Sequence, residues 1–269
     1  MTPLAIAGIG ICATGMATWA QAQTVLRSDV AQRVLDPLPR LSPDCLPPVE
    51  RRRANATTRL AISAATQAIE GMPPQEVAQL ATVFSSSDGD GEVLAHMLAA
   101  LAQAQVVLSP TLFHNSVFNA PAGYWSIGSH AHAASTTVSA GTASFAAGLK
   151  EAHGQVLATG APVLYIAYDA PFPATLASFA RSAEPFACAL RLVPLSASRG
   201  DGYGRLEQAR PDLEPKDPVI PPLAELCGFF AGNSAADALP LLVAIASRRR
   251  ARLALVDLDG ARLRLDYLP

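Results

Sequence analysis

Short continuous apolar runs alternate along the chain with stretches in which apolar residues recur every three or four positions. The continuous runs predict buried strands, and the periodic stretches predict helices. Strands are expected at 4–11, 81–86, 135–139, 163–168, 186–193, 252–257 and 262–267. Helices are expected at 55–70, 91–104, 124–130 and 235–247, and in the Ala-rich stretch that ends at Ala152. This alternation predicts an α/β fold with a mixed sheet.

Two stretches have the composition of connections. Residues 109–124 include Pro110 and Pro121 and are expected to form a loop. Residues 196–222 contain three glycines and five closely spaced prolines, which favours a flexible surface connection. We therefore expect one domain over residues 1–195. Residues 196–269 are expected to form a linker, a C-terminal helix and a β-hairpin packed on that same domain, with the Asp259-Gly260 pair at the hairpin turn.

The composition indicates a protein that is partly covered by a partner. Of the 269 residues, 50% are hydrophobic and 16% are charged, whereas about 25% charged residues is usual. Such a surface favours a large apolar interface, although an Ala-rich composition alone would give similar figures. The net charge of −2 gives no indication of binding to nucleic acid or to an anionic membrane.

The cysteines and histidines do not form a recognisable metal site. Cys12, Cys45, Cys188 and Cys227 are scattered and form no CxxC pair, so neither a zinc site nor a disulfide framework is expected. The pair His130 and His132 could offer two metal ligands, but no acidic residue or thiol lies near them in sequence. We expect no metal and no cofactor.

The N-terminus imitates a secretory signal without completing one. Residues 4–19 are apolar and Ala20-Gln-Ala22 resembles a cleavage site, but no Lys or Arg precedes Arg27. The basic segment of a signal peptide is therefore missing. No later stretch offers 18 unbroken apolar residues, so a membrane span is not expected. These features predict a cytoplasmic protein.

The stretch from Ser135 to Ala152 predicts a strand, a tight glycine turn and a helix. Enzymes use this geometry to present a nucleophile at a helix N-terminus, where backbone N–H groups point at a developing anion. The residue at the tip is Thr142. A hydroxyl has a far higher pKa than a thiol, so Thr142 would need a strong base beside it to act as a nucleophile.

Two other motifs are incomplete. Ser144 lacks the flanking glycines of the Gly-x-Ser-x-Gly elbow of hydrolases. Gly8 and Gly10 do not complete a dinucleotide-binding fingerprint, because Ala13 stands where the third glycine is expected.

Two neighbouring runs resemble a known family. Phe113–Ser126 reads FHNSVFNAPAGYWS, and residues 139–149 read SAGTASFAAGL. Together they are similar to the short group of β-ketoacyl synthase-like proteins. With the first strand, Ala5–Gly10, the resemblance covers roughly residues 1–195, the N-terminal half of a β-ketoacyl synthase. It implies a thiolase-like fold, a layered mixed sheet with helices, in which the second half is truncated.

The resemblance also implies that catalytic residues are missing. In catalytic members the turn reads Asp-Thr-Ala-Cys-Ser-Ser, and its cysteine falls on Thr142 here. The family takes two histidines from its second half, in a His-Gly-Thr-Gly-Thr motif and in an Asn followed by a Gly-rich turn. In this chain His153-Gly154 continues as Gln-Val, and Gly228–Gly232 matches the Gly-rich turn only faintly.

The function implied is that of a chain length factor in aryl polyene-type pigment synthesis. Such a subunit has no catalytic residues, forms a heterodimer with a catalytic ketosynthase and shapes the acyl tunnel. Acyl chains would arrive on acyl carrier protein through the complex. Tunnel-lining residues would be Phe113, His114, Phe118, Tyr124 and Phe145.

The same resemblance implies how the two subunits meet. The strand of Ser135, Thr136, Thr137, Val138 and Ser139 would pair with its equivalent across the two-fold axis. Two alternatives stay open. One is an independent hydrolase or acyltransferase that uses Thr142 or Ser144, and the other is a homodimeric scaffold protein without a tunnel.

Overall fold

The computed structural model describes residues 2–28, 35–105, 107–179, 182–198, 202–209, 221–260 and 262–269. Within them, eight strands form one mixed sheet. The strands are β1 (Leu4–Ala13), β2 (Ala81–Ser85), β3 (Ser135–Val138), β4 (Val163–Asp169), β5 (Phe186–Pro194), β6 (Arg205–Gln208), β7 (Ala251–Val256) and β8 (Arg262–Leu268). Their order in the sheet is β3-β2-β4-β5-β1-β6-β8-β7. β3, β2 and β4 run parallel, and the remaining pairs are antiparallel.

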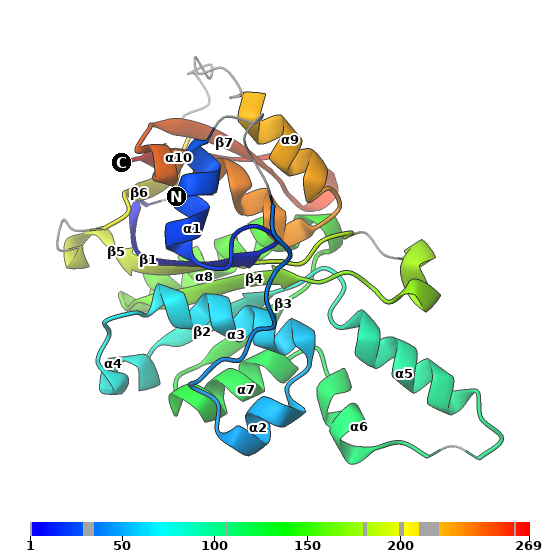
Figure 1. Cartoon of the computed structure of the whole chain (residues 1–269). Coiled ribbons are helices and arrows are strands. Elements are labelled where there is room, and N and C mark those ends of the chain that lie inside the picture. The colour runs from blue at the N-terminus through cyan, green and yellow to red at the C-terminus, as the bar shows by residue number, and fades with distance from the viewer. Residues whose placement is uncertain are drawn as a thin grey trace.

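Helices cover both faces of the sheet (Figure 1). The α-helices are α1 (Trp19–Arg27), α2 (Pro48–Arg53), α3 (Ala56–Ala68), α4 (Pro74–Ala78), α5 (Gly91–Leu101), α6 (Pro110–Ser116), α7 (Ala120–Ser129), α8 (Ser144–Thr159), α9 (Pro221–Phe229) and α10 (Leu239–Ser247). Short 3-10 turns are η2 (Gly141–Ala143), η3 (Ala174–Phe179), η4 (Leu195–Ala197), η5 (Ser234–Ala238) and η6 (Leu258–Gly260). One core cluster joins the sheet to α1, α8 and α10, and another joins it to α3 and α7.

Glycines bring α3 onto the sheet. The side chain of Asn55 accepts a hydrogen bond from the Thr58 amide and so starts the helix. A Cβ atom at Gly8 or Gly10 in β1 would collide with the backbone carbonyls of Ala68 or Ala64 in α3. These glycines therefore serve close packing of helix on strand, as in a site where another backbone approaches.

α8 lies equally close to the other face. A Cβ atom at Gly148 would come within 2.6 Å of the Tyr165 ring in β4. The Tyr165 hydroxyl donates to the carbonyl oxygen of Phe145 (2.7 Å) and also lies 2.8 Å from the Ser85 hydroxyl. This contact fixes the N-terminal end of α8 relative to β4 and to the carboxyl end of β2.

The C-terminal hairpin extends the same sheet. β6 pairs with β1 and with β8, and β7 pairs with β8. The Arg252 guanidinium spans the hairpin and binds both carboxylate oxygens of Asp266, at 2.6 and 2.7 Å. The predicted strands at 252–257 and 262–267 are thus confirmed as β7 and β8.

Three expectations about individual segments are wrong. Residues 109–124 are not a loop, because α6 and α7 each carry a proline in the first turn, where its missing N–H is harmless. The strand at 135–139 is not buried, since β3 lies at the edge of the sheet and is half exposed. The stretch 196–222 contains β6 and the start of α9. Its residues 199–201 and 210–220 lie outside the described residues.

Across the described ranges, none of the helices combines the length and the apolar character needed to cross a membrane.

Candidate functional site

The predicted strand, turn and helix meet at η2. Gly141 has a left-handed backbone with φ of 55°, and the Ala143 amide closes the turn on the carbonyl oxygen of Ala140 (3.0 Å). Thr142 lies exposed at the tip, directly before α8. None of the hydrogen bonds among the described residues joins its hydroxyl to a histidine or a carboxylate. The geometry of a nucleophile turn is present, and a base that could activate Thr142 is not seen in this part of the chain.

Ser144 holds the turn together from inside. It is fully buried, and its Oγ accepts a hydrogen bond from the Ala140 amide (3.0 Å). The same hydroxyl lies within donating distance of the carbonyl oxygens of Gly141 (2.7 Å) and Ser86 (3.2 Å). A hydroxyl engaged in this way stabilises the turn and is poorly placed to attack a substrate.

All four cysteines are free thiols, and the pKa of each is raised by burial. Burial raises the pKa of Cys12 and of Cys188 to about 12. Burial likewise raises the pKa of Cys45 and of Cys227 above the ordinary value. Because the thiolate is the reactive form, burial makes the Cys12 and Cys188 thiols poor nucleophiles near neutral pH.

The histidines that the sequence singled out lie in structural positions. His153 places Nε2 2.8 Å from the carbonyl oxygen of Thr2. His130 ends α7 in a left-handed conformation, and His132 is exposed in the loop that follows. The described ranges hold no group of three or more His, Cys, Asp or Glu side chains suited to a metal ion.

A buried network around Asp169 joins the C-terminal part of the chain to the strand ends near η2. The Asp169 carboxylate, at the end of β4, accepts hydrogen bonds from the hydroxyls of Ser86 (2.7 Å) and Ser234 (2.5 Å). Asn233 donates to the carbonyl oxygens of Asp169 (3.1 Å) and Glu184 (2.9 Å). Sequence reasoning missed this network. The available signals were a strand that ends on Asp and the Asn-Ser pair after the Gly-rich turn.

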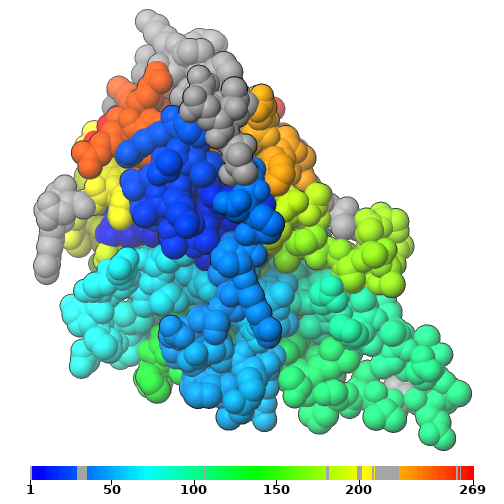
Figure 2. All heavy atoms as spheres, viewed as in Figure 1, coloured from blue at the N-terminus to red at the C-terminus, as the bar shows by residue number. Residues whose placement is uncertain are grey.

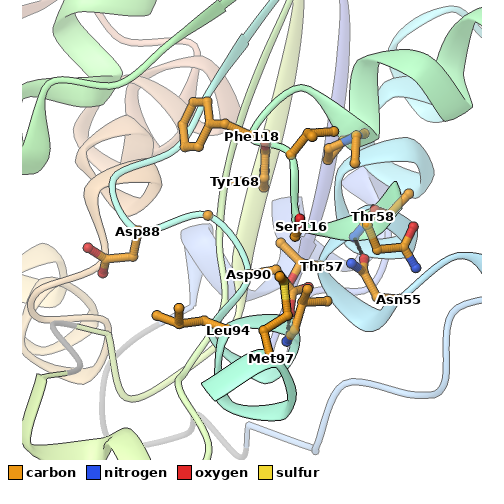
Figure 3. A pocket seen from close by; sticks show the side chains of 16 residues that line it. Asn55, Thr57, Thr58, Asp88, Asp90, Leu94, Met97, Ser116, Phe118 and Tyr168 are labelled. Carbon is orange, nitrogen blue, oxygen red and sulfur yellow. Dashed lines mark hydrogen bonds between the residues drawn. The ribbon is translucent and has the colours of Figure 1, made fainter. Parts of the chain in front are cut away.

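A cavity of about 350 Å³ opens between α3, α5, α6 and the end of β4. Its apolar wall includes Leu94 and Met97 of α5, together with Phe118 and the ring of Tyr168 (Figure 3). Thr58 and Asp90 border the same space. The cavity is large enough for the end of a medium-length acyl chain.

Of the five expected tunnel-lining residues, Phe118 borders this cavity. Tyr124 is buried and donates a hydrogen bond to the Asn115 side chain (2.9 Å), and Asn115 itself lines the cavity. Phe113 is exposed on α6.

The two remaining residues lie elsewhere. His114 is exposed and packs edge-to-face on the Tyr124 ring. Phe145 is buried on the opposite face of the sheet, against Tyr165. The structure therefore groups Phe118 with the cavity and does not bring all five side chains to one wall.

β3 forms one edge of the sheet. It pairs with β2 through Thr82–Ser85, and no strand pairs with its other side among the described residues. α7 contacts β3, α6 contacts α7, and α5 contacts α6. These helices and the residues between α6 and α7 carry several exposed apolar side chains, which we call the apolar surface of α5–α7. Its members are Leu94, Leu98, Leu101, Phe113, Val117, Phe118 and Ile127. Figure 2 shows the α5–α6 region projecting from the body of the molecule.

Solved structures with a similar fold include ketosynthase complexes. The chain is similar to a ketosynthase (ApeO) in complex with its chain length factor (ApeC) from Xenorhabdus doucetiae, with TM-score 0.72, 22% identity and 100% of both chains covered. It is similar to the ishigamide ketosynthase/chain length factor, with TM-score 0.72, 13% identity and 99% of each chain covered. A further similar structure is AntDE:AntF, a type II polyketide synthase acyl-carrier protein in complex with its ketosynthase bound to the hexaketide. There the TM-score is 0.70, the identity 11% and the coverage 99% of each chain.

These likenesses confirm the expected thiolase-like α/β fold. Comparison with curated protein sequences gives no match. A model of the β-ketoacyl synthase N-terminal domain matches residues 17–217, well over half of the chain. The chain belongs to the β-ketoacyl synthase N-terminal domain family, as the runs at 113–126 and 139–149 indicated.

Proposed function

We propose that this chain is a noncatalytic ketosynthase-like subunit, a chain length factor that pairs with a catalytic β-ketoacyl synthase in type II polyketide synthesis of the aryl polyene type. One observation carries the proposal. The turn on which the resemblance places the nucleophile of catalytic members is formed here by η2 before α8, with Thr142 at its tip, and none of the hydrogen bonds among the described residues joins the Thr142 hydroxyl to a base. The cysteine and histidines for condensation would come from the partner.

The partner surface follows from the sheet edge. Within the described residues β3 pairs on one side only, with β2, and an exposed edge strand invites pairing with another chain. The apolar surface of α5–α7 lies on neighbouring elements and exceeds the isolated apolar residues that a monomer normally exposes. We assign both to the contact with the ketosynthase subunit. Two of the similar structures are named as a ketosynthase with its chain length factor, which supports this assignment.

The cavity provides the means to limit product length. In this proposal the distal end of the acyl chain enters the space between α3, α5 and α6, where Phe118 forms part of the wall. A chain longer by one two-carbon unit would meet an overpacking cost of about 1–3 kcal/mol. Acyl chains reach the complex on acyl carrier protein in the cytoplasm. A neighbour of this fold is itself named as a complex that includes an acyl-carrier protein.

Co-expression with a ketosynthase from the same source tests the proposal. We expect a stable one-to-one complex that condenses acyl and malonyl groups, and no condensation by this chain alone. Thr142→Ala in this chain should leave the rate of the complex unchanged, whereas replacement of the partner's nucleophilic cysteine should abolish it. Condensation or thioester hydrolysis by the isolated chain, lost in Thr142→Ala, would refute the noncatalytic role.

A further inference from the structure

A hollow of about 520 Å³ lies between the C-terminal ends of α1 and α10. These two helices pack against each other, and Figure 1 shows them at the end of the molecule away from α5 and α6. The lining combines buried apolar side chains with the exposed residues Arg27, Arg248 and Arg249. We call this feature the arginine hollow.

The arginine hollow concentrates positive charge. The chain as a whole has a net charge of −2, so a basic composition does not account for the cluster. No Asp or Glu is among the lining residues, and within the described ranges no ion pair involves Arg27, Arg248 or Arg249. Because like charges repel, three guanidinium groups around one hollow favour an anion between them.

The three guanidinium groups can reach one ligand. Nε of Arg27 donates a hydrogen bond to the carbonyl oxygen of Ala246, which holds this guanidinium against the last turn of α10. Arg248 follows Ala246 by two residues, so their Cα atoms are no more than about 7.6 Å apart, and Arg249 is next in the chain. The side chains of Arg248 and Arg249 are exposed and have the rotamer freedom to turn toward Arg27.

Local folding does not account for the side chain of Arg248. This residue ends α10 in a left-handed conformation, with φ of 50°. Glycine is the usual residue at such a position, and Gly160 occupies it after α8. The turn uses the Arg248 amide, which donates to the carbonyl oxygen of Ile245 (3.1 Å), and needs no side chain. The guanidinium is therefore present at a conformational cost, which is typical of residues that contact a ligand.

Phosphate is the anion that suits this lining. Guanidinium groups bind phosphate oxygens through paired hydrogen bonds, and the Ser247 hydroxyl adds a further donor. We propose that the arginine hollow binds a phosphate-bearing ligand, held by Arg248, Arg249 and the terminal nitrogens of Arg27. The site is separate from the cavity between α3, α5 and α6 and does not depend on the ketosynthase partner. The phosphate group belongs either to a soluble compound or to a lipid headgroup, and the test distinguishes the two.

Two variants remove a guanidinium group without weakening the fold. Arg248→Gly relieves the left-handed backbone, so its thermal midpoint should equal or exceed that of the wild-type chain. Arg249→Gln keeps a long polar side chain and the amide that donates to the carbonyl oxygen of Ala244 (3.0 Å). Arg52→Gln is the matched control, because Arg52 is an exposed arginine on α2, outside the hollow. Arg27 is left in place, since its Nε holds the end of α10.

The test uses the whole chain with two phosphate probes. Calorimetric titration with pyrophosphate reports a soluble ligand, and sedimentation with phosphatidylglycerol vesicles reports a lipid headgroup. Acetate and phosphatidylcholine vesicles are the controls at the same ionic strength. We expect saturable binding of at least one phosphate probe, weakened about tenfold by Arg248→Gly and by Arg249→Gln. Arg52→Gln should leave the affinity unchanged, and added salt should lower it, because the guanidinium groups are exposed.

Each outcome decides the proposal. Binding of pyrophosphate alone assigns the hollow to a soluble phosphate compound, and binding of the vesicles alone assigns it to a lipid headgroup. Absence of binding to both probes overturns the proposal. Equal binding of acetate, or equal weakening by Arg52→Gln and Arg248→Gly, overturns it as well, because such binding reflects only the general charge of the surface.

Discussion

The hydroxyl of Ser234 donates a 2.5 Å hydrogen bond to the carboxylate of Asp169, and both residues are buried. Asp169 ends a parallel strand beside η2, and Ser234 follows the Gly228–Gly232 turn near the C-terminus. A buried carboxylate is tolerated when donors surround it. This contact therefore fixes the C-terminal segment against the end of β4.

Loss of this hydrogen bond should destabilise the fold. We expect Ser234→Ala to lower the free energy of unfolding by about 1.5–3 kcal/mol, because it takes a donor from a buried charge. Ser126→Ala is the control, since the Ser126 hydroxyl bonds a loop carbonyl at the surface (2.8 Å) and its loss should cost less than about 0.5 kcal/mol. Urea unfolding of both variants measures the difference. Equal urea midpoints for the two variants would show that the hydrogen bond from Ser234 to Asp169 adds no measurable stability.

Asp237 should make stability depend on pH. Its burial, and then the charge of Asp169, raise its pKa from 3.8 to about 6. Between these values the folded chain holds a proton that the unfolded chain has lost, so stability falls as pH rises from about 4 to 6 and then stays low. Because Asp237 is partly exposed, we expect Asp237→Asn to add only about 1–2 kcal/mol at pH 7.5.

The pH series supplies the control for Asp237. At pH 4 or below, Asp237 of the folded wild-type chain is protonated and therefore uncharged, like the asparagine that replaces it. The gain in stability from Asp237→Asn should therefore disappear. Chemical unfolding at pH 4.0 and 7.5 tests this directly. A gain of equal size at both values would assign the effect to packing rather than to ionisation.

The apolar surface of α5–α7 should be required for the complex. Leu98 on α5 is 47% exposed in the isolated chain. Leu98→Lys should weaken binding to the ketosynthase at least about tenfold, because a buried interface would have to desolvate the ammonium group. Leu195→Lys is similar in exposure, at 42%, but lies in η4 after β5, outside this surface. Calorimetry or co-purification measures the binding of both variants to the ketosynthase. Equal weakening by the two substitutions would argue against the apolar surface of α5–α7 as the interface.

Phe118 should limit product length. Phe118→Ala removes a ring from the cavity wall, and we expect products longer by about one two-carbon unit, or a broader distribution. Phe179→Ala offers a control, since Phe179 is largely exposed and does not line the cavity. Mass spectrometry of products from the complete complex reads out the length. An unchanged distribution in Phe118→Ala would remove that residue from the wall.

Local sequence was enough for the parts of the protein whose geometry depends on neighbours in the chain. The strand, glycine turn and helix around Thr142 follow from residues 135–152, and so does the absence of a thiol at the tip. The Asn55 cap of α3 and the hairpin turn at Asp259-Gly260 are equally local. These features need only backbone propensity and side-chain chemistry within a few residues.

Only the tertiary structure decided which side chains share a space. Phe113 and Phe118 stand in one sequence run, yet Phe118 borders the cavity and Phe113 faces outward. Thr58 of α3 and Asp90, the residue before α5, are far apart in sequence and line the same cavity. The composition favoured an apolar interface, but only the order of strands in the sheet shows that β3 lies at an edge, where another chain could pair with it. Contacts between residues far apart in sequence depend on packing, which a local pattern does not encode.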